Sequence, residues 1–106
     1  MSDELKRYRV VISGRAARML VSHAGFLAGI SKSAAEKLVE EFEAAAESLS
    51  TLPYRCPWLR GDFIPANKYR FLLFRKRYMM IYQIQDDTVF VDYVVDCRQD
   101  YQWLIN

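Results

Sequence analysis

The residues of this sequence that could do chemistry are mainly lysines and arginines. Residues 54–77 contain seven basic side chains and one acidic side chain, although the whole chain carries a net charge of only +2. The small net charge by itself predicts no polyanionic partner, but an uneven distribution of charge indicates where a charged partner would be met. The candidates from this segment and from the end of the chain are Lys68, Arg70, Arg75, Arg77 and Arg98.

Other kinds of chemistry have little support. Cys56 and Cys97 lie 41 positions apart with no His or Cys neighbour, so we predict reduced thiols and no zinc site. His23 is the single histidine and falls in a predicted helix, where we expect a structural position. No Ser-His-Asp set and no glycine-rich phosphate loop can be built. We therefore predict no metal and no cofactor.

Length and composition favour one independently folding unit. The chain has 106 residues, of which 52% are hydrophobic and 14% aromatic. A chain of this size buries roughly two-thirds of its unfolded surface, which predicts a single domain over residues 1–106. No apolar run approaches the ~20 residues that a bilayer span requires, and the first residues lack the apolar core of a secretory signal. We expect a cytoplasmic protein without a membrane partner.

The elements that must position the basic residues follow from the hydrophobic pattern. It predicts a strand at 7–12 and a helix at 15–30 that ends near Gly29. A second helix at 33–52 begins with a capping box at Ser33 and stops at Pro53. An ordered loop then extends to residue 68, and strands follow at 69–74, 78–84 and 89–97. Residues 98–106 form a tail. The order β-α-α-β-β-β predicts an α+β fold of two layers, in which an N-terminal strand and a helical hairpin pack on an antiparallel β-sheet.

Strand alternation then sorts the side chains. A two-residue turn at Asp86-Asp87 pairs Ile84 with Val89 and continues without interruption, which places Val94 on the outer face. In the preceding hairpin, a three-residue loop would bury Lys68 and Arg70, and burying unpaired charges is too costly. We therefore expect an even-numbered loop. Such a loop places Tyr69, Phe71 and Leu73 in the core.

These registers gather four basic residues on the side of the sheet turned away from the helices: Lys68, Arg70, Arg77 and Arg98. Between them lies an exposed apolar floor of Leu72, Met79, Ile81 and Val94. A cationic patch with an apolar centre is unusual for a monomer and predicts a partner surface. The alternative is an ordinary solvated face, on which Arg77 and Asp96 form a weak surface ion pair.

The arrangement resembles the RelE/ParE superfamily of bacterial toxins, which are the toxin halves of type II toxin-antitoxin pairs. The segments that carry the resemblance are Lys68-Tyr69-Arg70 at the start of one strand, Arg77-Tyr78-Met79-Met80-Ile81-Tyr82 in the next, and residues 94–100 at the end of the last. The resemblance implies a small toxin that a cognate antitoxin neutralises by wrapping it with an extended or helical segment.

Two activities of the superfamily are possible. RelE-like members cut mRNA in the ribosomal A site with a basic cluster similar in type and spacing to the four basic residues. On that reading the protein is a metal-independent endoribonuclease whose partners are the ribosome and mRNA. The arginines would stabilise crowded phosphate charge, Lys68 or Arg70 would assist at the other positions, and Tyr101 would contribute a proton or stack on a base. The residues after Arg98 align with no C-terminal catalytic residue of the RelE kind.

ParE-like members instead bind DNA gyrase and poison it without catalysis. Several end their last strand with a similar turn that holds an arginine and an aspartate, which Arg98 and Asp100 match. On this reading the patch, with its apolar floor and Arg75, forms the gyrase interface or the antitoxin groove. Both activities stay open on the sequence. The presence of four basic residues on one face favours mRNA cleavage.

Overall fold

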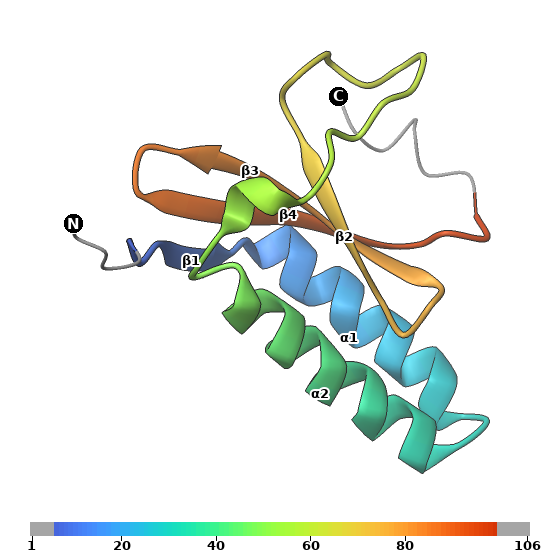
Figure 1. The fold of residues 1–106 in the computed structure, drawn as a ribbon. Helices are drawn as coiled ribbons and strands as arrows, with labels where there is room; N and C mark the ends of the chain where they lie inside the picture. Colours follow the sequence, from blue (N-terminus) through green and yellow to red (C-terminus); the bar gives the residue numbers. More distant parts are fainter. Residues whose placement is uncertain (1–5, 100–106) are drawn as a thin grey trace.

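A helical hairpin covers one face of a four-stranded sheet in this computed structural model, which describes residues 6–99 (Figure 1). The elements are β1 (Arg9–Ile12), α1 (Gly14–Ala28), α2 (Lys32–Ser48), the short 3₁₀ helix η1 (Pro53–Arg55), β2 (Arg70–Phe74), β3 (Tyr78–Gln85) and β4 (Thr88–Asp96). This order confirms the predicted α+β fold. Neither helix has the length and apolar character needed to cross a membrane within the described part of the chain.

Serine side chains start both helices. The hydroxyl of Ser13 accepts a hydrogen bond from the Ala16 N–H at 3.0 Å, and that of Ser31 accepts one from the Ala34 N–H at 3.2 Å. These bonds satisfy backbone donors that a helix N-terminus leaves free. The cap of α2 is therefore Ser31, two positions before the predicted Ser33.

The second helix ends earlier than predicted. It stops at Ser48, whereas the apolar pattern continues to Leu52. A residue before proline is disfavoured in the helical region, and Leu52 before Pro53 adopts φ 50° and ψ 47°. The hydroxyl of Ser48 also donates to the Ala45 carbonyl at 2.6 Å. The chain thus leaves the helix before the proline, and Leu52 becomes 59% exposed.

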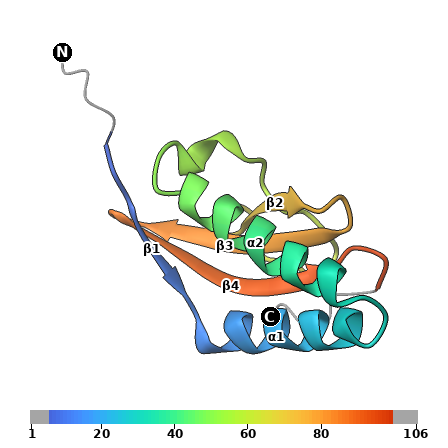
Figure 2. The same cartoon turned by 90° about the horizontal axis from the view of Figure 1, so that it is seen from below.

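The sheet is mixed. Its strand order is β1-β4-β3-β2, with β1 parallel to β4 and the other neighbours antiparallel. The parallel pairing runs from Arg9 with Thr88 to Ile12 with Val91, and Figure 2 shows β1 leading directly into α1. Parallel neighbours need a long connection between them. The helical hairpin and the strands that follow it provide this connection, so that β4 can lie beside β1 in the parallel direction. The predicted antiparallel arrangement therefore holds for β2, β3 and β4.

A β-bulge changes the predicted register of β3 and β4. The two-residue turn and the pairing of Ile84 with Val89 are confirmed, but the ladder shifts between Ile81 and Tyr82. The shift accommodates Asp92, whose carboxylate accepts a hydrogen bond from the Gln83 side chain at 2.7 Å. A bulge reverses the faces of all residues beyond it. The prediction that placed Val94 on the outer face was therefore wrong, because Val94 is buried under the helices.

The loop between β2 and β3 has three residues, not an even number. Phe74 pairs with Tyr78, so residues 75–77 form the loop. This register places Leu72 and Phe74 on the face that the helices cover, and leaves Leu73 52% exposed. The predicted burial of Leu73 and exposure of Leu72 were thus both wrong.

The charge of Arg70 does not prevent this register. Its guanidinium donates to the Cys56 carbonyl at 2.6 Å and to the Tyr54 carbonyl at 3.3 Å, and it lies 3.9 Å from the centre of the Trp58 ring. A half-buried cation with carbonyl acceptors and an aromatic face avoids most of the cost of burial. Lys68 lies before the strand and stays exposed.

A second core lies on the outer face of the sheet. The loop before β2 crosses this face with Leu59 and Ile64, which pack against Tyr69, Met79, Ile81, Tyr93 and Val95. Cys56, nearer its start, belongs to the core under the helices. Met79 is 3% exposed, and Ile81 and Val94 are fully buried. The predicted exposed apolar floor of Leu72, Met79, Ile81 and Val94 therefore does not exist. Its members contribute to two separate cores, one on each face of the sheet.

Candidate interaction site at one end of the sheet

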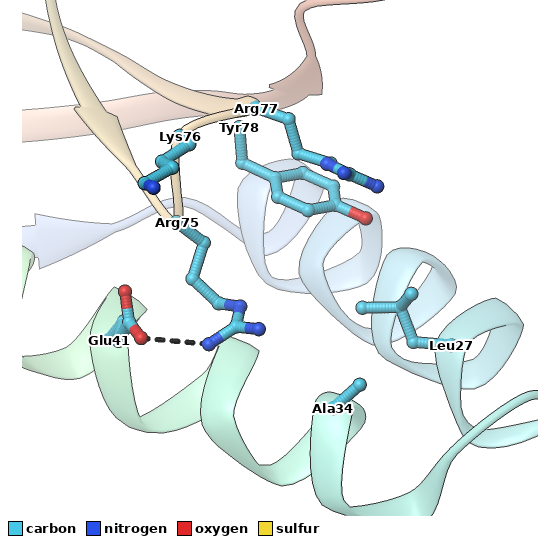
Figure 3. Close-up of a pocket in the computed structure, with 7 residues that line it drawn as sticks. All are labelled: Leu27, Ala34, Glu41, Arg75, Lys76, Arg77 and Tyr78. Carbon is cyan, nitrogen blue, oxygen red and sulfur yellow. Dashed lines mark hydrogen bonds and ion pairs between the residues drawn. The ribbon is translucent and has the colours of Figure 1, made fainter.

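Tyr78, at the start of β3, lies between two hollows. One, of about 430 Å³, is lined by Leu27, Ala34, Glu41, Arg75, Lys76, Arg77 and Tyr78 (Figure 3). The other, of about 320 Å³, is lined by Ser22, His23, Phe26, Tyr78, Asp96, Arg98 and Gln99. Because Tyr78 lines both hollows, the loop after β2 and the turn after β4 lie at the same end of the sheet. We call Arg75, Lys76, Arg77 and Arg98 the basic pole.

The tip of the β2–β3 hairpin holds three of these cations in a tight turn. Arg75 and Lys76 adopt φ angles of 49° and 64°, a left-handed conformation that costs about 1 kcal/mol for a residue with a Cβ. The Arg77 N–H donates to the Arg75 carbonyl at 2.7 Å, and the Cys97 N–H donates to the Arg77 carbonyl at 2.7 Å. The second bond ties the tip to the end of β4.

Two of the four cations have acidic partners. The Arg75 guanidinium lies 2.9 Å from the Glu41 carboxylate on α2. Arg98 binds Asp96 with two nitrogens, at 3.1 Å and 2.7 Å. These hydrogen bonds lower the pKa of the buried Asp96 carboxyl and raise the pKa of Arg98.

The other two cations, Lys76 and Arg77, are exposed and have no acidic partner within residues 6–99. An exposed cation without a partner can bind an anion without first breaking an ion pair. The basic pole therefore keeps a positive charge that is available to a partner.

His23 closes the second hollow. Its Nε2 atom lies 2.9 Å from the Val94 carbonyl oxygen, and because a carbonyl only accepts, Nε2 carries the proton. Its ring centre is 5.2 Å from that of Tyr78. His23 thus anchors α1 to β4 and supports the tyrosine that separates the two hollows.

The predicted cluster of four basic residues divides into two groups. Arg77 and Arg98 line the hollows on either side of Tyr78, together with Arg75. Lys68 instead lies 5.2 Å from the ring of Tyr69, and Arg70 is held under Tyr54 and Trp58. The prediction of a single electropositive hollow was therefore wrong. The three-residue loop turned Arg70 toward the helical face and away from Arg77.

Some predicted residues lie elsewhere, and some residues of the site were not predicted. Tyr101 is outside the described residues. Lys76, Glu41 and Tyr78 line the site although the sequence offered them no role. The run of three cations at residues 75–77, inside a predicted turn, was the signal from which the role of the hairpin tip could have been predicted. Glu41 carried no signal, because its approach to the hairpin depends on how α2 packs.

Both carboxylates of the site and its histidine are held in contacts within the chain. The carboxylates of Glu41 and Asp96 are each paired with an arginine, and the Nε2 proton of His23 is donated to a carbonyl.

This architecture, a helical hairpin on a small mixed sheet with a cationic end, is that of a RelE/ParE superfamily toxin. The family model of the ParE toxin of the type II toxin-antitoxin system parDE matches residues 10–101. The chain therefore belongs to the ParE toxin family of type II toxin-antitoxin systems.

A solved structure supports the fold. A chain described as the chromosomal ParDE TA system from P. aeruginosa superposes with a TM-score of 0.69 at 11% identity, over 86% of this chain and 97% of that chain. At this identity the likeness shows the fold alone. A comparison with curated proteins finds no significant match.

Proposed function

We propose that this toxin inhibits DNA gyrase by binding it, without cutting mRNA, and that a cognate antitoxin neutralises it. The observation that carries the proposal is the division of the basic residues. Arg77 and Arg98 line one site, whereas Lys68 and Arg70 line neither of its hollows. The nuclease reading gathered all four on one face, with the arginines at the phosphate and Lys68 or Arg70 at the other positions of the reaction. Membership of the ParE family supports the same conclusion.

The basic pole provides the contact surface. Arg75 and Arg98 are held by Glu41 and Asp96, so their guanidinium groups are positioned before a partner arrives. Ordering the cations in advance reduces the entropy lost on binding. Lys76 and Arg77 add charge without a partner among the described residues. The complementary surface on the target is therefore acidic or carries phosphates.

Purified components distinguish the two activities. Wild-type protein is added to gyrase, ATP and supercoiled plasmid, and trapped double-strand breaks are measured on gels. The same preparation is added to translating ribosomes, and mRNA ends are mapped. We expect DNA breaks and intact mRNA. Cut mRNA without trapped DNA breaks would overturn the proposal in favour of the RelE-like activity.

Single substitutions at exposed lysines and arginines then test the site. Arg77→Gln and Lys76→Gln remove cations of the basic pole, and we expect each to lower the rate of DNA breakage by about 10-fold, from the loss of a charge-assisted contact. Lys68→Gln is the matched control and should leave breakage unchanged. If Lys68→Gln abolished toxicity while Arg77→Gln did not, the assignment of the site would be wrong.

A further inference from the structure

Phe26 is an exposed aromatic side chain in the second hollow beside Tyr78. It lies on α1, and 67% of its surface is exposed. Of the large apolar side chains that are exposed within residues 6–99, Phe26 is the one that lines a hollow beside Tyr78. The aromatic ring therefore adjoins the cations through which we propose that the toxin binds gyrase.

The fold does not explain a phenylalanine at this position. The contacts of α1 with the core include those of Ala16, Met19 and Leu27. Phe26 belongs to neither of the two cores that the described residues form. An aromatic ring that stays in water adds no burial energy, and phenylalanine favours a helix less than alanine or leucine does. We therefore look for its role in a contact with another molecule.

The hollow combines an apolar wall with polar groups that are held in place. Its volume of about 320 Å³ leaves room for a protruding side chain of a partner. The rings of His23 and Tyr78 stand 5.2 Å apart in its wall. Arg98 lies at its edge, and the Arg98 side chain is 55% exposed although it is paired with Asp96. An apolar centre within a charged rim is the usual composition of a protein interface.

We propose that Phe26 is the apolar anchor of the surface that binds gyrase. A protruding apolar side chain of gyrase packs against Phe26 in the hollow beside Tyr78, and anionic groups around that side chain meet Arg77 and Arg98. Interfaces draw most of their affinity from a few packed anchors, whereas charges at the rim mainly speed association and select the partner. The inference rests on the proposed function, in which gyrase is the target.

A second copy of this chain is a poorer occupant of the hollow. Two copies joined there would bring two basic poles together, including the exposed Lys76 and Arg77, which have no acidic partner within residues 6–99. Like charges that meet across an interface oppose association. The same cations attract a target that carries anionic groups. The charges around Phe26 thus favour a partner of opposite charge.

Substitution of Phe26 tests the anchor. Phe26→Ala removes the ring, and we expect it to weaken gyrase binding by about 30-fold, as the loss of a central anchor does in other interfaces. Phe26→Leu keeps an apolar side chain and should recover most of the affinity. Binding of the purified toxin to immobilised gyrase is measured by biolayer interferometry, and trapped DNA breaks are measured on gels with the same preparations.

Phe63 provides a matched control. It is a phenylalanine with the same exposed fraction, 67%, but it lies in the loop before β2 and lines neither hollow. Phe63→Ala should leave gyrase binding and DNA breakage unchanged. Both alanine variants should unfold at the temperature of the wild type, because substitutions of exposed side chains change stability little.

The salt dependence of binding separates the anchor from the cations. Screening by salt weakens contacts between exposed charges but not apolar contacts. We therefore expect Phe26→Ala to lower gyrase affinity by the same factor at low and at high salt. Arg77→Gln should lower it mainly at low salt.

The outcomes that would overturn the inference are distinct. Wild-type gyrase affinity of Phe26→Ala would overturn it, whether that variant lost antitoxin affinity, which would assign the hollow to the antitoxin, or unfolded at a lower temperature, which would assign the ring to packing within the chain. Failure of the wild-type toxin to bind gyrase would instead overturn the proposed function and this inference together.

Discussion

At the scale of single residues, Asp96 and Arg98 determine the geometry after β4. The Asp96 side chain is 8% exposed, and it accepts hydrogen bonds from the backbone N–H and the guanidinium of Arg98. A buried carboxylate is tolerated only when such donors surround it. The same bonds hold Arg98 at the edge of the second hollow. This pair therefore fixes the turn after β4 and the position of one cation of the basic pole.

We expect Asp96→Asn to lower the free energy of unfolding by about 1 kcal/mol at pH 7, because it loses charge-assisted hydrogen bonds to a partly exposed arginine. The folded state lowers the pKa of Asp96, so the wild-type contribution is present above the unfolded pKa and is lost as pH falls through the folded pKa. Urea unfolding at pH 7 and at strongly acidic pH measures this. A difference between the two proteins that did not shrink in acid would contradict it.

At the scale of elements, the β2–β3 hairpin combines backbone strain with charge. Arg75 and Lys76 both have positive φ angles, and no glycine relieves them. Strain of this kind persists where surrounding contacts hold it, here the Arg75–Glu41 ion pair and the bond from Cys97 to Arg77. Because Arg75 and Lys76 occupy these left-handed positions, the tip of the hairpin carries two charges that glycine residues would lack.

We expect Lys76→Gly to increase stability by about 1 kcal/mol and to decrease toxicity, because glycine adopts positive φ without steric cost but removes the charge. Asn67→Gly is the control: Asn67 also has a positive φ, of 55°, but lies in the loop before β2, at the opposite end of that strand from the tip. It should stabilise less, since asparagine tolerates this conformation, and toxicity should be unchanged. Thermal unfolding and growth inhibition are the measurements. Loss of toxicity in both variants would count against the tip.

At the scale of the whole molecule, the sheet is buried on both faces. The helices cover one face, and the part of the loop before β2 that carries Leu59 and Ile64 covers the other. The strand faces are therefore occupied by the two cores, and the cations of the basic pole lie at the end of the sheet.

Ile81 tests the second core. We expect Ile81→Ala to lower the free energy of unfolding by about 2–5 kcal/mol, as for other large-to-small changes in a core. On the exposed floor that the sequence predicts, the same change would cost less than about 0.5 kcal/mol. Leu73→Ala, at a position that is 52% exposed, is the control and should have a small effect. Denaturant titration decides between the two placements.

The sequence by itself determined the element order, the helical spans near their observed positions, the two-residue turn at Asp86-Asp87 and the superfamily. These features depend on periodicity, caps and turn residues, all of which are local. The sequence also singled out Arg77 and Arg98, which line the two hollows beside Tyr78 because the start of β3 pairs with the end of β4.

Only the tertiary structure decided the faces of the strands and the neighbours of the cations. The bulge at Asp92 reversed Val94, and the carbonyls of Tyr54 and Cys56 allowed Arg70 to turn inward. Both effects depend on residues outside the strand concerned. The cost of burying the Arg70 charge could therefore not be judged from its strand alone. The loop over the outer face likewise converted a predicted surface into a core, because it supplied the apolar side chains that cover Met79 and Ile81.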